Sequence, residues 1–299
     1  MTFVEIRSGS TSARIDPDKG FNLFSLVVDG FDYIHTEPGF PEMGKVTHSG
    51  NPILFPWPNR IAGARFTSDG REYELPVTEP ATGAAIHGYA AFAPWRLVAA
   101  ADDWVTAEFQ LSRDASDQVW PADGGLRVTF RVEPTVLHVT TEVFSLDVDL
   151  PFGLGFHPYF RVPGPFDQWL LQCDADSAWP LSNMVPSGPP APAPADLDFR
   201  TPRRLGDQHL DDVLTGLPEA PGLTKRAVLR SMASTLSVFS DPAFTEYVMF
   251  TPGSRDAVAI EPYTCTTNAV NLQAVGVEAG WRVLPAGQTA TFGWSVHIE

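Results

Sequence analysis

The segment Val105-Thr-Ala-Glu-Phe-Gln-Leu111 decides the fold class of this chain. Its apolar residues stand at every second position, and the polar residues Thr106, Glu108 and Gln110 stand between them. When the period is two, alternate side chains lie on opposite faces of an extended strand. One face then contacts the core and the other faces solvent. Residues 126–132 and 290–298 repeat the pattern. These segments predict half-buried β-strands.

Further strand-like segments and many helix breakers extend this prediction to the whole chain. The sequence contains 28 prolines and 24 glycines, and an interior proline removes a helix hydrogen bond and clashes with the preceding turn. Many antiparallel strands with almost no helix predict an all-β protein, a large sandwich or barrel. The other β-rich segments include residues 21–28, 95–98, 136–144, 169–173, 227–231, 235–240, 247–250 and 257–261.

One low-complexity stretch raises the question of a domain boundary. Pro186-Ser-Gly-Pro-Pro-Ala-Pro-Ala-Pro194 favours extended polyproline II, either as a spacer or as a surface loop. The strand patterns on its two sides are alike, and the candidate site residues fall on both sides. We therefore expect a single domain over residues 1–299, because all-β domains often exceed 200 residues.

Charge and hydropathy exclude several classes of function. The chain has 20 Lys+Arg against 36 Asp+Glu, a net charge of −16, and its longest basic run is Arg203-Arg204. A nucleic-acid binder needs a basic face to displace counterions, so no nucleic-acid partner is expected. No stretch approaches the ~20 consecutive apolar residues of a membrane span, and the N-terminus lacks a signal-peptide pattern. We expect a cytoplasmic protein without a membrane partner.

The two cysteines, Cys173 and Cys265, limit redox and metal chemistry. A disulfide scaffold and a cysteine-based zinc site both need more sulfurs at closer spacing. Free cysteines are mostly small buried apolar residues. We expect that role here.

Two histidines and one glutamate stand in distinctive settings. His87 precedes a glycine that lets the backbone approach closely, and His157 lies in Gly-Leu-Gly-Phe-His-Pro-Tyr-Phe, where desolvation lowers its pKa unless an acid partners it. Glu261 follows an apolar run and precedes Pro262-Tyr263, which predicts a carboxylate emerging at a strand end beside an aromatic ring. Taken singly, each histidine is better explained as a core residue and the glutamate as a solvated residue at a strand end.

A segment rich in aromatic residues adds Asn59 and Arg60 to the candidates. Both are bracketed by Phe55, Trp57 and Phe66. An arginine among aromatic residues needs acceptors for its five donors, which either a polyhydroxylated ligand or a structural carboxylate supplies.

The ordered set of motifs resembles the aldose 1-epimerases, or galactose mutarotases, from about residue 20 to the end. The matching segments are Phe55-Pro-Trp-Pro-Asn59-Arg60-Ile61-Ala62, Ile86-His87-Gly88, Gly155-Phe156-His157-Pro158-Tyr159-Phe160, Leu210-Asp211-Asp212-Val213-Leu214-Thr215, Ile260-Glu261-Pro262-Tyr263 and Gly280-Trp-Arg-Val-Leu-Pro-Ala-Gly287-Gln288.

The resemblance implies a fold and a role for each matching residue. The implied fold is a large antiparallel β-sandwich of the galactose mutarotase type. His157 would be the general acid for the sugar ring oxygen and Glu261 the general base for the anomeric hydroxyl. Arg60, His87 and Asp211 would hold the sugar hydroxyls, with Asn59 supporting the loop. The sequence departs from the family pattern at Pro56-Trp-Pro58, where the family has small residues between its aromatic residue and Asn-Arg. The doublet Asp211-Asp212 leaves open which of the two aspartates is the substrate-binding one.

The implied function is acid–base interconversion of the α and β anomers of a free aldohexose, with the sugar as partner and no metal or cofactor. We expect a monomer or homodimer. The alternatives are a hexose-6-phosphate epimerase, with Arg65 and Arg71 as candidate phosphate ligands, and a non-catalytic sugar-binding protein. A metal site at His87, His157 and Glu261, and a glycoside hydrolase using two carboxylates, are further alternatives.

Overall fold

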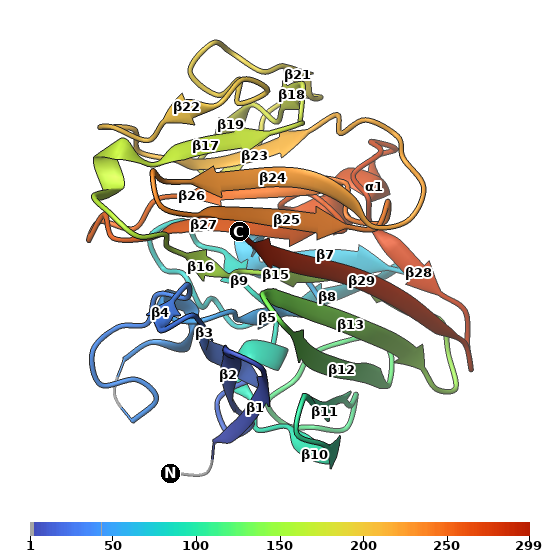
Figure 1. The fold of residues 1–299 in the computed structure, drawn as a ribbon. Coiled ribbons are helices and arrows are strands. Elements are labelled where there is room, and N and C mark those ends of the chain that lie inside the picture. The colour runs from blue at the N-terminus through green and yellow to red at the C-terminus, as the bar shows by residue number, and fades with distance from the viewer. Residues whose placement is uncertain (1–2, 43) are drawn as a thin grey trace.

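The structure is a computed structural model that describes residues 3–42 and 44–299. Strands make up 46% of it and helices 6%, which confirms the predicted all-β class. Two large antiparallel sheets pack face to face (Figure 1). The predicted antiparallel β-sandwich is therefore confirmed.

The first large sheet contains nine strands and is built from the long alternating segments. In sheet order they are β10 (Arg96–Ala100), β11 (Trp104–Leu111), β12 (Gly124–Glu133), β13 (Val136–Ser145), β29 (Thr289–Ile298), β25 (Thr235–Ser240), β24 (Thr224–Arg230), β17 (Leu170–Cys173) and β22 (Arg203–Arg204).

The second large sheet contains eight strands, most of them short. In sheet order they are β21 (Ala191–Pro192), β18 (Ser177–Ala178), β23 (Asp211–Thr215), β26 (Glu246–Phe250), β27 (Val258–Tyr263), β15 (Gly155–Phe156) and β5 (Ile53–Leu54), and β16 (Tyr159–Phe160) also pairs with β27.

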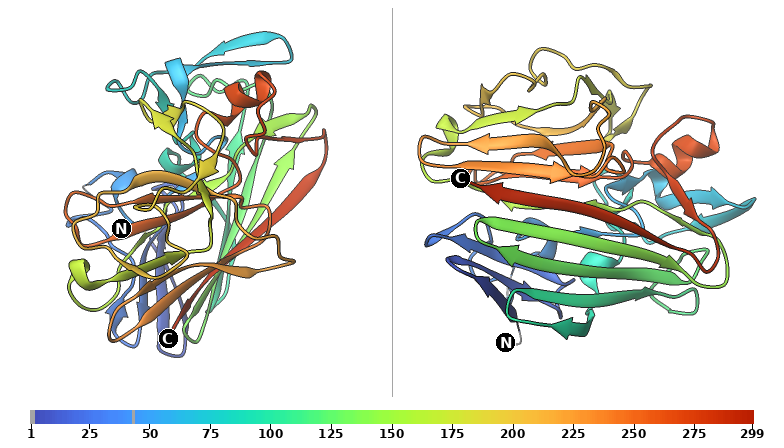
Figure 2. Two further views of the ribbon diagram at one scale, coloured as in Figure 1. Left: turned by 90° about the horizontal axis from the view of Figure 1, so that it is seen from above. Right: turned by 45° about the vertical axis from the view of Figure 1, so that its right-hand side comes forward.

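Smaller elements complete the fold, and the N-terminal strands pack beside β11 and β12 (Figure 2). The four-stranded N-terminal sheet contains β1 (Val4–Ser8), β2 (Thr11–Asp16), β3 (Asn22–Val28) and β4 (Phe31–Asp32). The two-stranded pairs are β6 (Arg60–Ile61) with β9 (Ala85–Ile86), β7 (Arg65–Ser68) with β8 (Arg71–Glu74), β14 (Leu150–Phe152) with β28 (Arg282–Leu284), and β19 (Leu181–Ser182) with β20 (Val185–Pro186). The helical turns are η1 (Val46–His48), η2 (Ala62–Ala64), η3 (Ala90–Phe92), η4 (Phe166–Gln168) and α1 (Ala269–Ala274).

An apolar core fills the space between the two large sheets. Trp294 of β29 packs on Phe156 of β15, with ring centroids 5.3 Å apart. Both side chains are buried. The N-terminal sheet joins the same core, because Phe21 packs on Phe130 of β12 at 5.1 Å. Aromatic pairs of this kind add roughly 0.5–1.5 kcal/mol each beyond the area they bury.

The polar face expected on β11 is only partly open to solvent. Gln110 is exposed, whereas Thr106 and Glu108 are buried, each 7% exposed. Thr106 shares a hydrogen bond of 2.7 Å with Thr129 on β12, and Glu108 is covered by arginines from both adjacent strands. Cross-strand pairing hides these two side chains, which residue alternation along one strand does not reveal.

The proline-rich stretch contributes two short strands, β20 and β21. Strand β21 forms one edge of the eight-stranded sheet, a position where proline's missing N–H costs no ladder hydrogen bond. The nine-stranded sheet takes strands from both sides of the stretch.

Cys173 and Cys265 are both free and buried. Within residues 3–42 and 44–299, no helix has the length and apolar character needed to cross a membrane.

Candidate active site

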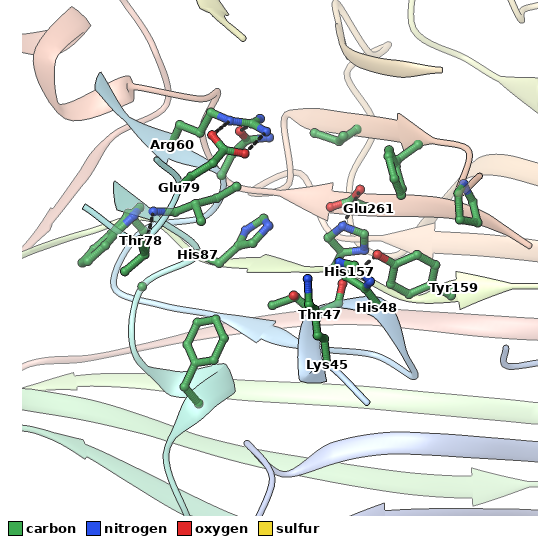
Figure 3. A pocket seen from close by; sticks show the side chains of 18 of the residues that line it. Lys45, Thr47, His48, Arg60, Thr78, Glu79, His87, His157, Tyr159 and Glu261 are labelled. Atoms are coloured by element: carbon green, nitrogen blue, oxygen red, sulfur yellow. Dashed lines mark hydrogen bonds and ion pairs between the residues drawn. The ribbon is translucent and has the colours of Figure 1, made fainter. Parts of the chain in front are cut away.

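Strand register brings His157 and Glu261 together. Gly155 on β15 pairs with Tyr263 on β27, and Tyr159 on β16 pairs with Ala259 on the same strand. His157, midway between the two paired positions, therefore falls opposite Glu261. Its Nε2 lies 3.2 Å from Oε1 of Glu261 (Figure 3).

The position of Glu261 differs from the one predicted. We expected the carboxylate at a strand end, at the mouth of the sandwich and opposed to His157 across a sugar ring. Instead Glu261 lies inside β27, is 1% exposed and contacts His157 directly. Pro262 does not end the strand: β27 continues through it to Tyr263, and it stays in register with Tyr247 of β26.

Burial sets the protonation of this pair. It lowers the pKa of the His157 imidazole to about 3 and raises the pKa of the Glu261 carboxyl well above its usual value. In both cases removal from water disfavours the charged form. Burial therefore favours a protonated carboxyl beside a neutral imidazole over the ion pair. Moving that proton from Glu261 to His157 creates the ion pair without exchange with solvent.

Two tyrosines surround the pair. The hydroxyl of Tyr263 donates to Oε2 of Glu261 at 2.5 Å. The ring of Tyr159 stacks on His157, with centroids 4.6 Å apart and planes 23° from parallel, and its hydroxyl donates to the carbonyl of Thr47 at 2.7 Å. The imidazole is thus fixed by packing on one side and by the carboxyl on another.

Arg60 occupies a second corner of the cavity, on the short strand β6. Its Nε and Nη2 donate to the two oxygens of Glu79, at 2.6 and 2.7 Å, and its Nη1 donates to Oδ1 of Asn59 at 3.0 Å. These three bonds leave two of the five guanidinium N–H groups for a ligand. Arg60 therefore pairs with a structural carboxylate, that of Glu79, and also lines the cavity.

His87 follows β9, the partner strand of β6, and faces His157. The two rings are 5.6 Å apart and 82° from parallel. The following Gly88 has φ +65°, and a Cβ there would lie 2.2 Å from the carbonyl oxygen of Phe55, so only glycine permits this close approach. Burial, with His157 and Arg60 nearby, lowers the pKa of His87 well below its usual value. Its Nδ1 has no hydrogen-bond partner among the described residues.

The aspartate doublet lies on β23, where alternation separates the two side chains. Asp211 pairs with Phe250 of β26 and lines the cavity with it. Asp212 pairs with Met249, which belongs to the core on the opposite face of the sheet. Burial raises the pKa of the Asp211 carboxyl, and Arg60 opposes that shift. The geometry thus favours Asp211 as the cavity-facing aspartate.

All six predicted site residues line one cavity of about 1280 Å³. Sequence reasoning missed Glu79, His35 and His48, which line this cavity. All three lie outside the quoted motifs and carry no local signal. Trp57 also lines the cavity but is only 3% exposed. Its ring packs on Trp120 at 5.2 Å.

The cavity is rich in acidic groups and has few cations. The carboxylates of Glu37, Asp117, Asp211 and Asp256 line it in addition to Glu79 and Glu261. Lys45 and Arg60 are its lysine and arginine, and Lys45 points into it (Figure 3). Arg65 and Arg71, our candidate phosphate ligands, lie on the β7–β8 hairpin and do not line it. In the described part of the chain, no group of three or more His, Cys, Asp or Glu side chains is arranged to hold a metal ion.

Comparison with known proteins connects this site to one family. A model of the aldose 1-epimerase family matches residues 11–297. The uncharacterized protein YihR of Escherichia coli (strain K12) is 26% identical over 247 residues, which cover 78% of this chain and 75% of YihR. The uncharacterized protein YphB of the same organism is 24% identical over 302 residues, covering 91% of this chain and 99% of YphB.

Solved structures share the fold at lower identity. A galactose mutarotase-like protein from Clostridium acetobutylicum superposes with a TM-score of 0.87 at 21% identity, covering 99% of this chain and 95% of that one. The GalM/aldose epimerase homologue from C. elegans gives 0.85 at 18% identity, covering 100% and 98%.

Proposed function

Because this chain belongs to the aldose 1-epimerase family, we propose that it interconverts the α and β anomers of a free aldohexose. The observation that carries the proposal is the buried contact of 3.2 Å between His157 and Glu261. This contact sets a carboxyl group against an imidazole at the wall of a cavity that is also lined by Arg60, His87 and Asp211.

The chemistry needs an acid and a base at two oxygens of one carbon. Oε1 of Glu261 takes the proton of the anomeric hydroxyl, the bond between C1 and the ring oxygen breaks, and Nε2–H of His157 protonates the ring oxygen. Rotation about C1–C2 exposes the other face of the aldehyde, and ring closure reverses both transfers. Because the anomeric hydroxyl oxygen and the ring oxygen are both bonded to C1, the adjacent side chains of Glu261 and His157 reach both oxygens. General acid and base catalysis typically contribute ~10²–10⁴-fold each.

The proton inventory fits this cycle. Ring opening begins from ionised Glu261 and protonated His157 and ends with both neutral, which is the state that burial favours in the free protein. One proton therefore circulates within the pair and the sugar. A second proton on the pair removes the base, and loss of the only proton removes the acid. We expect a bell-shaped pH–rate profile whose two limbs belong to the pair.

The remaining site residues hold the sugar. The two free N–H groups of Arg60 donate to sugar hydroxyls, Asp211 accepts from them, and His87 offers its free Nδ1. Asn59 acts on Arg60 through their hydrogen bond of 3.0 Å. Each is a short polar contact of the kind that fixes the orientation of a ligand in a pocket.

The test is direct observation of anomer exchange. Freshly dissolved α-glucose and α-galactose are followed by proton NMR with and without the protein. We expect a protein-dependent acceleration that is proportional to protein concentration. Unchanged spontaneous rates, combined with saturable sugar binding, would instead establish a non-catalytic sugar-binding protein.

One observation favours the hexose-6-phosphate alternative, namely Lys45 pointing into the cavity. The acidic lining opposes it, since a phosphate dianion is repelled by carboxylates. The same NMR assay with glucose 6-phosphate, on wild type and Lys45→Met, separates the two substrates. We expect the free sugar to be preferred and the Lys45→Met protein to retain that activity.

A metal-dependent reaction is tested by chelation of the purified protein. Proton transfer alone accounts for anomer exchange. We expect dialysis against EDTA to leave the rate unchanged. Loss of activity that iron or zinc restores would favour a metal centre at His87, His157 and Glu261.

A further inference from the structure

We propose that Tyr263 is a positioning residue for this reaction, holding Oε2 of Glu261 so that only Oε1 faces His157 and the anomeric hydroxyl. The inference rests on the proposed function and assigns a task to a residue outside the acid–base pair. The Tyr263 hydroxyl lies 2.5 Å from Oε2, whereas Oε1 lies 3.2 Å from Nε2 of His157. The two carboxyl oxygens therefore have different partners.

Strand geometry accounts for the contact. Tyr263 lies two residues after Glu261 on β27, so both side chains project from the same face of the sheet. Tyr263 is fully buried. Gly155 lies opposite it, and a Cβ at Gly155 would come within 2.5 Å of Cδ1 of the tyrosine ring. The missing side chain at Gly155 gives the ring its place beside Glu261, and this packing does not depend on the hydroxyl.

The hydroxyl also affects which group holds the proton. A donor to a carboxylate stabilises its ionised form, so Tyr263 opposes the effect of burial on the pKa of Glu261. Without the hydroxyl, Oε2 is buried with no donor, and the carboxyl holds its proton more strongly. Besides Tyr263, the charged and titratable groups that face the pair are Asp211 on β23, Arg60 on β6, Tyr159 on β16, His87 after β9 and His48 on η1.

The experiment compares two tyrosine-to-phenylalanine variants. Tyr263→Phe removes the hydroxyl beside Glu261 and keeps the ring. The matched control, Tyr247→Phe, removes a hydroxyl that is equally buried, lies on the adjacent strand β26 and donates to Ser240 at 2.8 Å, away from the cavity. We expect Tyr263→Phe to lower kcat roughly 10- to 100-fold, the range for a hydrogen bond to a charged group, with little change in KM.

The pH profile separates positioning from a purely structural role. Burial favours Glu261 as the holder of the pair's proton, and the Tyr263 hydroxyl opposes that effect, so removal of the hydroxyl should move the basic limb to higher pH. Tyr247→Phe should leave both limbs in place. If the two variants show the same kcat and the same limbs, the hydroxyl of Tyr263 has only a structural role and the proposal is overturned.

A second measurement needs no turnover. Nitrogen-15 NMR of labelled histidine follows the His157 imidazole through pH in wild type and in both variants. We expect Tyr263→Phe alone to move the high-pH transition, in which the Glu261 proton is lost, to higher pH. If wild type fails to exchange anomers but this shift is present, the proposed function falls and the positioning role stands. If the wild type exchanges anomers rapidly but Tyr263→Phe does not shift this transition, the proposed function stands and the positioning role of Tyr263 falls.

Discussion

Two buried glutamates, one in each large sheet, are placed by the same strand geometry and have opposite chemistry. In the nine-stranded sheet, Glu108 accepts from Arg96 on β10 at 2.8 Å and from Arg127 on β12 at 3.0 Å. In the eight-stranded sheet, Glu261 contacts His157 at 3.2 Å, and no arginine or lysine of the described residues forms an ion pair with it. Glu108 has its arginine partners on the two neighbouring strands, whereas Glu261 contacts His157, between β15 and β16, and Tyr263 on its own strand.

The neighbours in register decide what each carboxylate does. Two arginines lower the pKa of Glu108 despite its burial, so that it stays charged and holds β10, β11 and β12 together. Burial raises the pKa of Glu261, which favours its protonated form. One sheet thus uses a carboxylate for structure, whereas the other keeps one for chemistry.

The largest expected effect comes from Glu261→Gln. Glutamine keeps the shape and much of the hydrogen bonding but cannot accept a proton. We expect turnover to fall by about 10³- to 10⁴-fold while sugar binding is retained. The measurement combines the NMR exchange rate with calorimetric sugar binding. A stable and active variant would show that Glu261 is structural, like Glu108.

His157→Asn should reduce turnover by at least ~10²-fold, because asparagine cannot deliver a proton to the ring oxygen. Circular dichroism and thermal melting check that the protein stays folded. If the loss of activity follows the loss of folded protein, His157 is a core histidine. His87→Asn provides the contrast, since it should weaken sugar binding as well as rate.

The comparison also explains what the sequence could predict. The long strands of the nine-stranded sheet show clear alternation, as in β11 and β29, because one face meets the core along their whole length. The strands around the site, β15 and β16, contain two residues each and have no period to detect. His157, which lies between them, was a candidate because of its setting, and the family resemblance implied its role.

Long-range pairing accounts for what the sequence did not predict. The contact between His157 and Glu261 depends on β15 and β16 both joining β27, and Glu79 reaches Arg60 from a loop. Pro262 suggested a strand end because a proline usually interrupts pairing, but β27 continues through it in register with β26. No local pattern encodes either feature.

A smaller effect is expected at Glu79, which orients Arg60 through two hydrogen bonds. Glu79→Gln breaks this paired contact, and the guanidinium loses its fixed direction. We expect KM to rise roughly 10-fold, with kcat changed less than ~3-fold, because an interaction with a charged group is weakened in binding. Glu74→Gln is the control, since Glu74 pairs with the exposed Arg65 outside the cavity. Equal KM values in the two variants would contradict the role of Arg60 in binding.

The smallest effect on activity should come from Glu108→Gln. Its arginine partners are largely solvent-exposed, so we expect a loss of only about 1 kcal/mol in the free energy of unfolding at pH 7, with anomer exchange unchanged. The sign of the pH dependence follows from the lowered pKa of Glu108. Its contribution is present above the unfolded pKa of glutamate, about 4.3, and disappears as pH falls through the lower folded value. Urea unfolding of wild type and variant should therefore differ at pH 7 and converge near pH 2. A difference that persists at low pH would mean that Glu108 stabilises the sheet by packing and not by charge.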